Sequence, residues 1–174
     1  MSKAFTKEDV VDQPVVVPSR APLPAGVVNY VTSRGLALLR EESATLEKER
    51  AELEQVFDAE ERARRLAIVA ARLGELAGRI GSAVVVDPGG GATDQVRFGA
   101  TVTVRALEGA HAGQDRRYTI VGVDEASAAD GRIAFVSPLA RAVLGRRVGE
   151  SVSMVSGRRE EELEIVAVEY APAR

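Results

Sequence analysis

Three carboxylates close together in the first half of the chain are the residues best placed to do chemistry. Asp58, Glu60 and Glu61 lie within four positions, and Arg64 and Arg65 follow shortly after them. Carboxylate oxygens suit Mg²⁺, and two carboxylates about one helical turn apart can converge on one ion. Such a pair could help to hold a metal ion. The simpler alternative is a group of solvated turn residues, with both arginines paired to nearby acids.

Other familiar catalytic groups are scarce in this chain. With no cysteine there can be no disulfide, no thiolate zinc site and no thiol nucleophile. The single histidine, His111, lies in a stretch of Gly and Ala that is typical of a hairpin tip, so we expect it to be a solvated loop residue. Thiol and metal–histidine chemistry are therefore excluded, and Ser/His/Asp catalysis is not expected.

Composition points to a folded, water-exposed protein of modest size. The 174 residues are 45% hydrophobic and 28% charged, which is ordinary for globular domains. No apolar run reaches the roughly 18 residues that a membrane helix needs, and the first residues lack the apolar stretch of a signal peptide. We expect a cytoplasmic protein without membrane contact. The net charge of −3 argues against nonspecific binding to DNA.

The first 28 residues are predicted to be an extended or disordered tail. They contain four prolines, Pro14, Pro18, Pro22 and Pro24, and show no sustained periodicity. The alternative is that the stretch 15–17, three consecutive valines, docks as a strand.

Residues 29–82 are predicted to form an antiparallel coiled-coil hairpin. A first seam at 3,4 spacing predicts a helix of about 25 residues and about 38 Å after a cap at Thr32 or Ser33. A second seam ends near Gly81, and a short connection at 57–61 joins the two helices. The first seam is Leu36, Leu39, Ser43, Leu46, Arg50, Leu53 and Phe57, and the second is Leu66, Val69, Leu73, Leu76 and Ile80.

Charge supports this pairing of the two arms. Residues 41–61 carry nine acids, whereas residues 62–79 carry five arginines and one acid. Opposite charges on successive segments suggest that the arms lie side by side and pair across their flanks.

The rest of the chain is predicted to be a strand and a Gly-rich linker over 83–95, then a second domain over 96–174. Short apolar or alternating runs separated by turn residues suit a small antiparallel sheet. They cover 101–107, 118–123, 133–136, 151–155 and 163–168. Ser137 as N-cap, Pro138 at the first position and Gly145 as the stop predict one short helix. The expected class is therefore α+β.

Several separate segments resemble the bacterial Gre transcript cleavage factors, in the order and at the spacing of that family. The similar segments are 29–35, leading into Leu36 and Leu39, then 98–102, 118–122, 137–145, 148–152 and 169–170. Together they span roughly residues 29–170. The resemblance implies a coiled-coil hairpin followed by an FKBP-like domain without isomerase activity.

The resemblance also implies a partner and a role. In that family the C-terminal domain docks on RNA polymerase at the mouth of the secondary channel, and the hairpin tip reaches the catalytic magnesium. Tip acids help to hold a second metal ion and position water, so that the polymerase hydrolyses backtracked RNA. The implied partners are bacterial RNA polymerase and, at the tip, the 3′ end of the nascent RNA, and the implied metal is the polymerase's own Mg²⁺. We expect a monomer.

The family's tip pattern, Gly-Asp, two variable residues and Glu-Asn-Ala, maps onto 57–63. Asp58 and Glu61 take the acidic positions, with Glu60 as an alternative register, whereas Phe57 replaces the glycine and Arg62 the asparagine. Arg62 could pair with a tip acid and weaken metal binding, or it could contact phosphate. Phe57, Arg62, Arg64 and Arg65, together with Ser137, Pro138, Leu139, Ala140 and Arg141, are the candidate contacts with a partner.

The hairpin is also shorter than family hairpins by about one heptad in each arm, which removes roughly 10 Å of reach. We therefore favour a regulator that occupies or competes for the channel. A competent cleavage factor remains the alternative, and an interaction module unrelated to polymerase is a third possibility. Prolyl isomerase activity is disfavoured, because three Tyr, four Phe and no Trp offer little to line a proline pocket.

Overall fold

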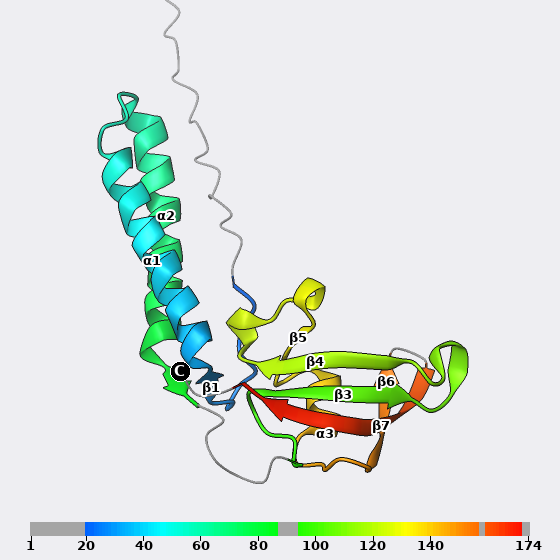
Figure 1. The fold of residues 1–174 in the computed structure, drawn as a ribbon. Helices are drawn as coiled ribbons and strands as arrows, with labels where there is room; N and C mark the ends of the chain where they lie inside the picture. Colours follow the sequence, from blue (N-terminus) through cyan, green and yellow to red (C-terminus); the bar gives the residue numbers. More distant parts are fainter. Residues whose placement is uncertain (1–19, 87–93, 157–158, 172–174) are drawn as a thin grey trace, which may run out of the picture.

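The computed structural model describes residues 20–86, 94–156 and 159–171, and shows a long helical hairpin rising from a small sheet domain (Figure 1). The valine stretch 15–17 and the linker glycines 89–91 lie outside the described residues. No helix in the described part of the chain is both long and apolar enough to cross a membrane.

The hairpin consists of α1 (Ser33–Leu53) and α2 (Ala59–Gly81), two antiparallel helices whose apolar seams face each other. Thr32 caps α1 by accepting a hydrogen bond from the Gly35 N–H at 2.8 Å. At about 1.5 Å per residue, the 21 residues of α1 give an arm of about 32 Å. The buried seam is Leu39, Leu46, Leu53, Val69 and Leu76, with Val56, Leu66, Leu73 and Ile80 packed against it. The two-seam prediction is therefore confirmed for all of these positions except Val56, which it did not include.

Three details of the predicted hairpin are wrong. Arg50, a predicted member of the first seam, is exposed and pairs with Glu47. Phe57 is fully exposed, because α1 ends at Leu53 and Val56 packs against the seam in its place. Among the described residues, the ion pairs that join two arm residues also lie within single helices, because side chains three or four residues apart on one helix face are neighbours. They are Lys48–Glu52, Arg50–Glu47 and Arg64–Glu61, and none of these three joins α1 to α2.

A short parallel ladder ties the two ends of the hairpin together. Strand β1 (Asn29–Val31) comes directly before α1, and strand β2 (Ala83–Val85) directly after α2. The buried Asn29 side chain reinforces this base, since its Nδ2 donates to the Arg79 carbonyl at 2.9 Å and to Ser82 Oγ at 3.2 Å.

The second domain is a five-stranded sheet of order β5-β4-β3-β7-β6 with one short helix, α3 (Pro138–Val143). Alternation along β3 buries Val102 and Val104, which pack in a core with Ile120 and Ile165. The α+β prediction is confirmed. The strands are β3 (Ala100–Ala106), β4 (Asp115–Val121), β5 (Arg132–Ala134), β6 (Ser151–Ser156) and β7 (Arg159–Tyr170), and the 3-10 turns are η1 (Gly109–His111), η2 (Val123–Glu125) and η3 (Ala128–Asp130).

The sequence predicted an antiparallel sheet, but one pair of strands in the observed sheet is parallel. Strand β5 runs parallel to β4, with Ile120 opposite Ile133. A parallel neighbour needs a connection that crosses back along the sheet, and the segment from Gly122 to Gly131, which contains η2 and η3, provides it. The histidine prediction is confirmed, because exposed His111 lies in η1 between β3 and β4.

The hairpin base rests on this crossover segment and on an aromatic cluster. Tyr30 of β1 lies with its ring centroid 6.1 Å from Phe98 and 5.8 Å from Phe135. Gly122 packs so closely that a Cβ there would lie 2.8 Å from the Tyr30 carbonyl oxygen. The sheet domain and the base of the hairpin are therefore in intimate contact.

Glu125 makes three polar contacts at this junction. Its carboxylate accepts a hydrogen bond from the Thr32 hydroxyl and pairs with Arg34 at 3.2 Å and Arg132 at 2.5 Å, while its side chain is 2% exposed. The first turn of α1 has no acidic residue of its own. Glu125 therefore places a negative charge at the positive end of that helix dipole from the other domain.

Candidate functional site at the hairpin tip

The tip joins the two helices through residues 54–58, and Asp58 ends this connection. Its Oδ1 accepts a hydrogen bond from the Glu61 N–H at 2.8 Å, which makes Asp58 the N-cap of α2. The predicted connection at 57–61 therefore begins and ends three residues earlier. Asp58 and Glu61 lie about one helical turn apart, a spacing at which two carboxylates can converge on one ion.

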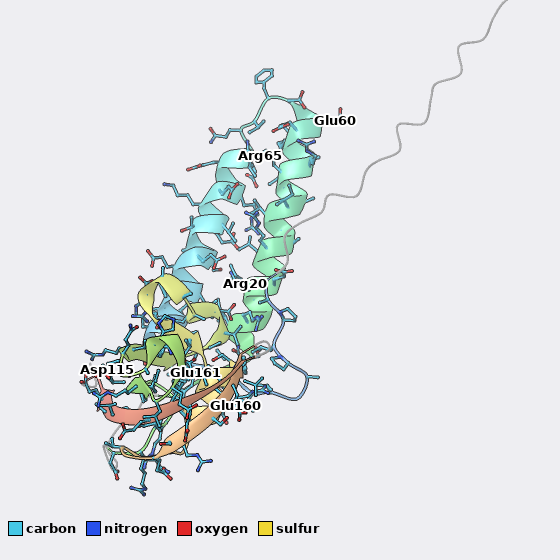
Figure 2. All side chains as sticks on the ribbon, turned by 90° about the vertical axis from the view of Figure 1, so that its right-hand side faces the viewer. Arg20, Glu60, Arg65, Asp115, Glu160 and Glu161 are labelled. Atoms are coloured by element: carbon cyan, nitrogen blue, oxygen red, sulfur yellow. The ribbon has the colours of Figure 1, made fainter. Side chains whose placement is uncertain are left out.

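Glu60 and Glu61 belong to the first turn of α2 and are exposed. Figure 2 shows Glu60 at the outer end of the hairpin, with Arg65 farther down the arm. Glu61 pairs with Arg64 at 3.7 Å, but both side chains are about half exposed, so this pair contributes little stability. The acids remain accessible at the positive end of the helix dipole.

Arg62 binds the backbone of the tip and is not paired with Asp58 or Glu61 in the described part of the chain, while its contact with phosphate stays a prediction. Its Nη1 donates to the Val56 carbonyl oxygen at 2.7 Å, so it binds the backbone at the end of the first arm and holds the tip turn closed. The Val56 carbonyl lies beyond the end of α1, in the connection between the two helices, and Arg62 supplies it with a hydrogen-bond donor.

The tip does not gather a complete set of metal ligands. In the parts of the chain that the structure describes, no group of three or more Asp, Glu or His side chains is arranged to hold an ion. The carboxylates of Asp58 and Glu61 suit Mg²⁺ by their chemistry, but an ion bound there would need further oxygen ligands from a partner or from water.

Phe57 projects from the tip without packing on the protein. Its relative exposure is 105%, the highest among the exposed large hydrophobic residues. The turn is closed by the Asp58 cap and the Arg62 bond, so neither hydrogen bond needs the phenyl ring. A fully exposed aromatic ring with no structural duty is well suited to anchor a partner.

The role of Asp58 as N-cap can be tested separately from the role of its negative charge. We expect Asp58→Ala to destabilise the hairpin by about 1 kcal/mol, because the Glu61 N–H loses its acceptor. Asp58→Asn should keep the stability, since asparagine caps equally well without the negative charge. Urea unfolding followed by circular dichroism measures both. Equal losses for the two variants would show that the charge, and not the cap, supports the fold.

The second group of candidate contacts lies at α3, and its residues differ in how exposed they are to solvent. Ser137 accepts a hydrogen bond from the Ala140 N–H at 3.3 Å and is the predicted N-cap. Pro138 and Arg141 are exposed and Leu139 is half-buried against the core. Ala140 is fully buried, so its proposed contact with a partner is wrong. It faces the sheet because it lies three residues before the buried Val143.

Charged residues on the sheet domain are largely engaged with one another. The two hydrogen bonds from Arg105 to Asp115, at 2.7 and 3.0 Å, lower the pKa of that carboxyl below its ordinary value. Other pairs are Arg117–Glu169, Arg116–Glu161 and Arg147–Asp94. Figure 2 shows Asp115, Glu160 and Glu161 on this domain, away from the hairpin tip. The tip is therefore the stronger candidate.

Comparison with known proteins gives one consistent result. Residues 91–170 match the family model for the C-terminal part of the transcription elongation factors GreA and GreB. The chain is 38% identical over 157 residues to a transcription elongation factor GreB from Neisseria meningitidis, covering 82% of this chain and 94% of that protein. It is 32% identical over 155 residues to a GreA from Ralstonia nicotianae, covering 80% and 96%. A solved structure of a GreA/GreB factor from Nitrosomonas europaea aligns over 81% of this chain and 98% of that one, at 21% identity and a TM-score of 0.41.

Proposed function

The chain belongs to the GreA/GreB family of transcription elongation factors, and we propose that it binds bacterial RNA polymerase at the secondary channel with its hairpin tip inserted. The observation that carries this proposal is the tip itself, where exposed acids and a fully exposed Phe57 lie at the far end of the hairpin from the sheet domain. The polymerase is the enzyme in this proposal, and the protein is an accessory factor.

In the bound state we propose that the tip occupies the channel without completing a metal site. Arms of 21 and 23 residues extend about 32 and 35 Å. A carboxylate must approach an ion to about 2.0–2.6 Å, so a hairpin that is too short by even a few ångströms cannot supply a ligand. The protein would then compete with longer factors for the same channel and so modulate elongation.

One observation favours the second candidate, a competent cleavage factor. Asp58 and Glu61 lie on one turn. Of their four carboxylate oxygens, only Oδ1 of Asp58 accepts a hydrogen bond within the described residues. These two residues would then contribute ligands to the Mg²⁺ of the polymerase active site, which supplies charge stabilisation for phosphodiester hydrolysis. In this case the hairpin has to enter the channel more deeply.

Binding to the polymerase is the first test of either candidate. A fluorophore on Ala44→Cys, an exposed position on α1, can report binding because the chain has no other cysteine. The expected result is saturable binding to the cognate core polymerase that an unlabelled standard Gre factor displaces. No binding at micromolar polymerase would favour the interaction module unrelated to transcription.

Phe57 should contribute strongly to that binding. We expect Phe57→Ala to weaken affinity for the polymerase about five- to tenfold, which is typical for an aromatic anchor at an interface. The exposed ring contributes nothing to packing, so the unfolding midpoint should be unchanged. Leu38→Ala, which removes a half-exposed leucine from α1, is the matched control and should bind normally. Equal affinities of the Phe57 and Leu38 variants would remove Phe57 from the interface.

A further inference from the structure

A buried carboxylate on the crossover segment joins three parts of the protein. Asp124, in η2, has a side chain that is only 6% exposed. Its Oδ1 accepts a hydrogen bond from Arg20 Nη1 at 3.0 Å, and its Oδ2 lies 3.7 Å from Nε of Arg79 near the end of α2. A buried carboxylate of this kind depends on both arginines for compensation of its charge.

Arg20 connects more elements than any other residue of this junction. Besides Asp124, its guanidinium binds Glu42 on α1, and its backbone N–H donates to Glu75 Oε2 on α2 at 3.3 Å. The chain continues this contact at the next residue, because the Ala21 carbonyl accepts a hydrogen bond from Arg79. Figure 2 shows Arg20 beside the lower part of the hairpin. Residues 20 and 21, which we call the strap, thus touch both helices and the sheet domain.

The strap and Glu125 fix different degrees of freedom. Glu125 holds only the beginning of α1, through Thr32 and Arg34. This contact and the packing of Tyr30 against the sheet domain both lie at the end of the hairpin where α1 begins, and a rod that is held at one end can tilt about that end. Asp124, Arg79 and the strap add a second point on α2, so that the direction of the hairpin is set by both.

At this second point of attachment, two buried polar atoms lack hydrogen-bond partners among the described residues. Nη1 of Arg79 and Oδ2 of Asp124 are buried without a hydrogen-bond partner. Buried polar atoms that lack partners raise the free energy of the arrangement that buries them. The closed junction therefore depends on the strap, and loss of the strap would let water reach these atoms.

We propose that residues Arg20 and Ala21 form an interdomain strap that fixes the direction in which the hairpin tip points, and that its release lets the hairpin swing on the sheet domain. Residues ahead of the hairpin would in this way control where the tip can reach. The proposal concerns the free protein and does not depend on binding to polymerase.

The test measures the distance between the two domains directly. Because the chain has no cysteine, spin labels on Ala51→Cys near the tip and Ser151→Cys on β6 report one distance by pulsed electron resonance. We expect a narrow distribution in the otherwise unmodified protein, and one that is at least about twice as wide in Arg20→Met. Asp124→Asn should widen it similarly, and the double variant should add little, because both remove the same contact.

Arg40→Met is the matched control, since Arg40 is an exposed arginine of α1, and it should leave the distribution narrow. Circular dichroism should show full helicity in every variant, because neither Arg20 nor Asp124 belongs to the seam of the hairpin. Distributions for both Arg20→Met and Asp124→Asn that match the Arg40 control would overturn the proposal. If the distribution widens in only one of these two variants, the contact between Arg20 and Asp124 is not what fixes the direction of the hairpin.

Discussion

A backtracked elongation complex given this protein alone is expected to cleave its RNA no faster than the complex without any factor. Added before a standard Gre factor, the protein should instead suppress cleavage. At a free concentration about 100 times its Kd, mass action leaves roughly 1% of the complexes open to a competitor that is present below its own Kd. The expected physical reason is reach: on our expectation that each arm lacks about one heptad, the proposed docking would leave the tip acids roughly 10 Å short of a ligand position.

The tip acids provide the control for this experiment. Asp58→Asn combined with Glu61→Gln removes two negative charges and keeps both the cap and the side-chain volumes. If the protein acts by occupancy, this double variant competes as well as the unmodified protein, when compared at equal fractional binding. Cleavage that the unmodified protein accelerates and the double variant does not would contradict our prediction and identify a working cleavage factor.

The largest effect on stability is expected at Glu125. Glu125→Ala should lower the free energy of unfolding by about 3 kcal/mol, because it strips a buried carboxylate from two arginines and a hydroxyl. Arg34 is 55% exposed and can be solvated, which keeps the loss at the lower end of the range for buried pairs. The Thr32 hydroxyl also loses the acceptor that orients it toward the Gly35 N–H, so the cap of α1 weakens. Urea unfolding followed by circular dichroism measures the change.

Two further variants show whether the charge is responsible. Glu125→Gln keeps the shape and one acceptor oxygen but no longer compensates Arg132, so it should lie between Glu125→Ala and the unmodified protein. Asp130→Ala, which removes an exposed acid from the same crossover segment, should change stability by less than about 0.5 kcal/mol. A loss for Glu125→Ala no larger than that for Asp130→Ala would show that the hairpin base does not need this contact.

The hairpin was largely predictable from the sequence because its determinants are local and periodic. Leu39, Leu46 and Leu53 recur at heptad spacing, and burial follows that spacing directly. The tip was predicted less well, because a seam pattern does not show where a helix ends. Phe57 continues the 3,4 spacing and yet lies outside α1. The signal that could have placed the end is Asp58 followed three residues later by Glu61, a pattern typical of an N-cap.

The junction between hairpin and sheet was not predictable, because its partners are far apart in the chain. Arg20 and Asp124 are 104 residues apart, and Thr32 and Glu125 are 93 apart. No periodicity marks such pairs, and each residue read alone resembles an ordinary surface charge. The same applies to the parallel pairing of β5 with β4, which depends on the path of the crossover and not on the strand's own residues.

The ladder between β1 and β2 allows the length of the hairpin to change without moving its two ends. Val31 and Val85 are register partners, so the chain enters and leaves the arm at one place, whatever length lies between. Seven residues added to each arm would lengthen it by about 10.5 Å and return every seam position to its original face. The sheet domain, β1 and β2 would be unchanged. Arm length could thus be altered in steps, by selection or by design, while docking surface and tip chemistry stay the same.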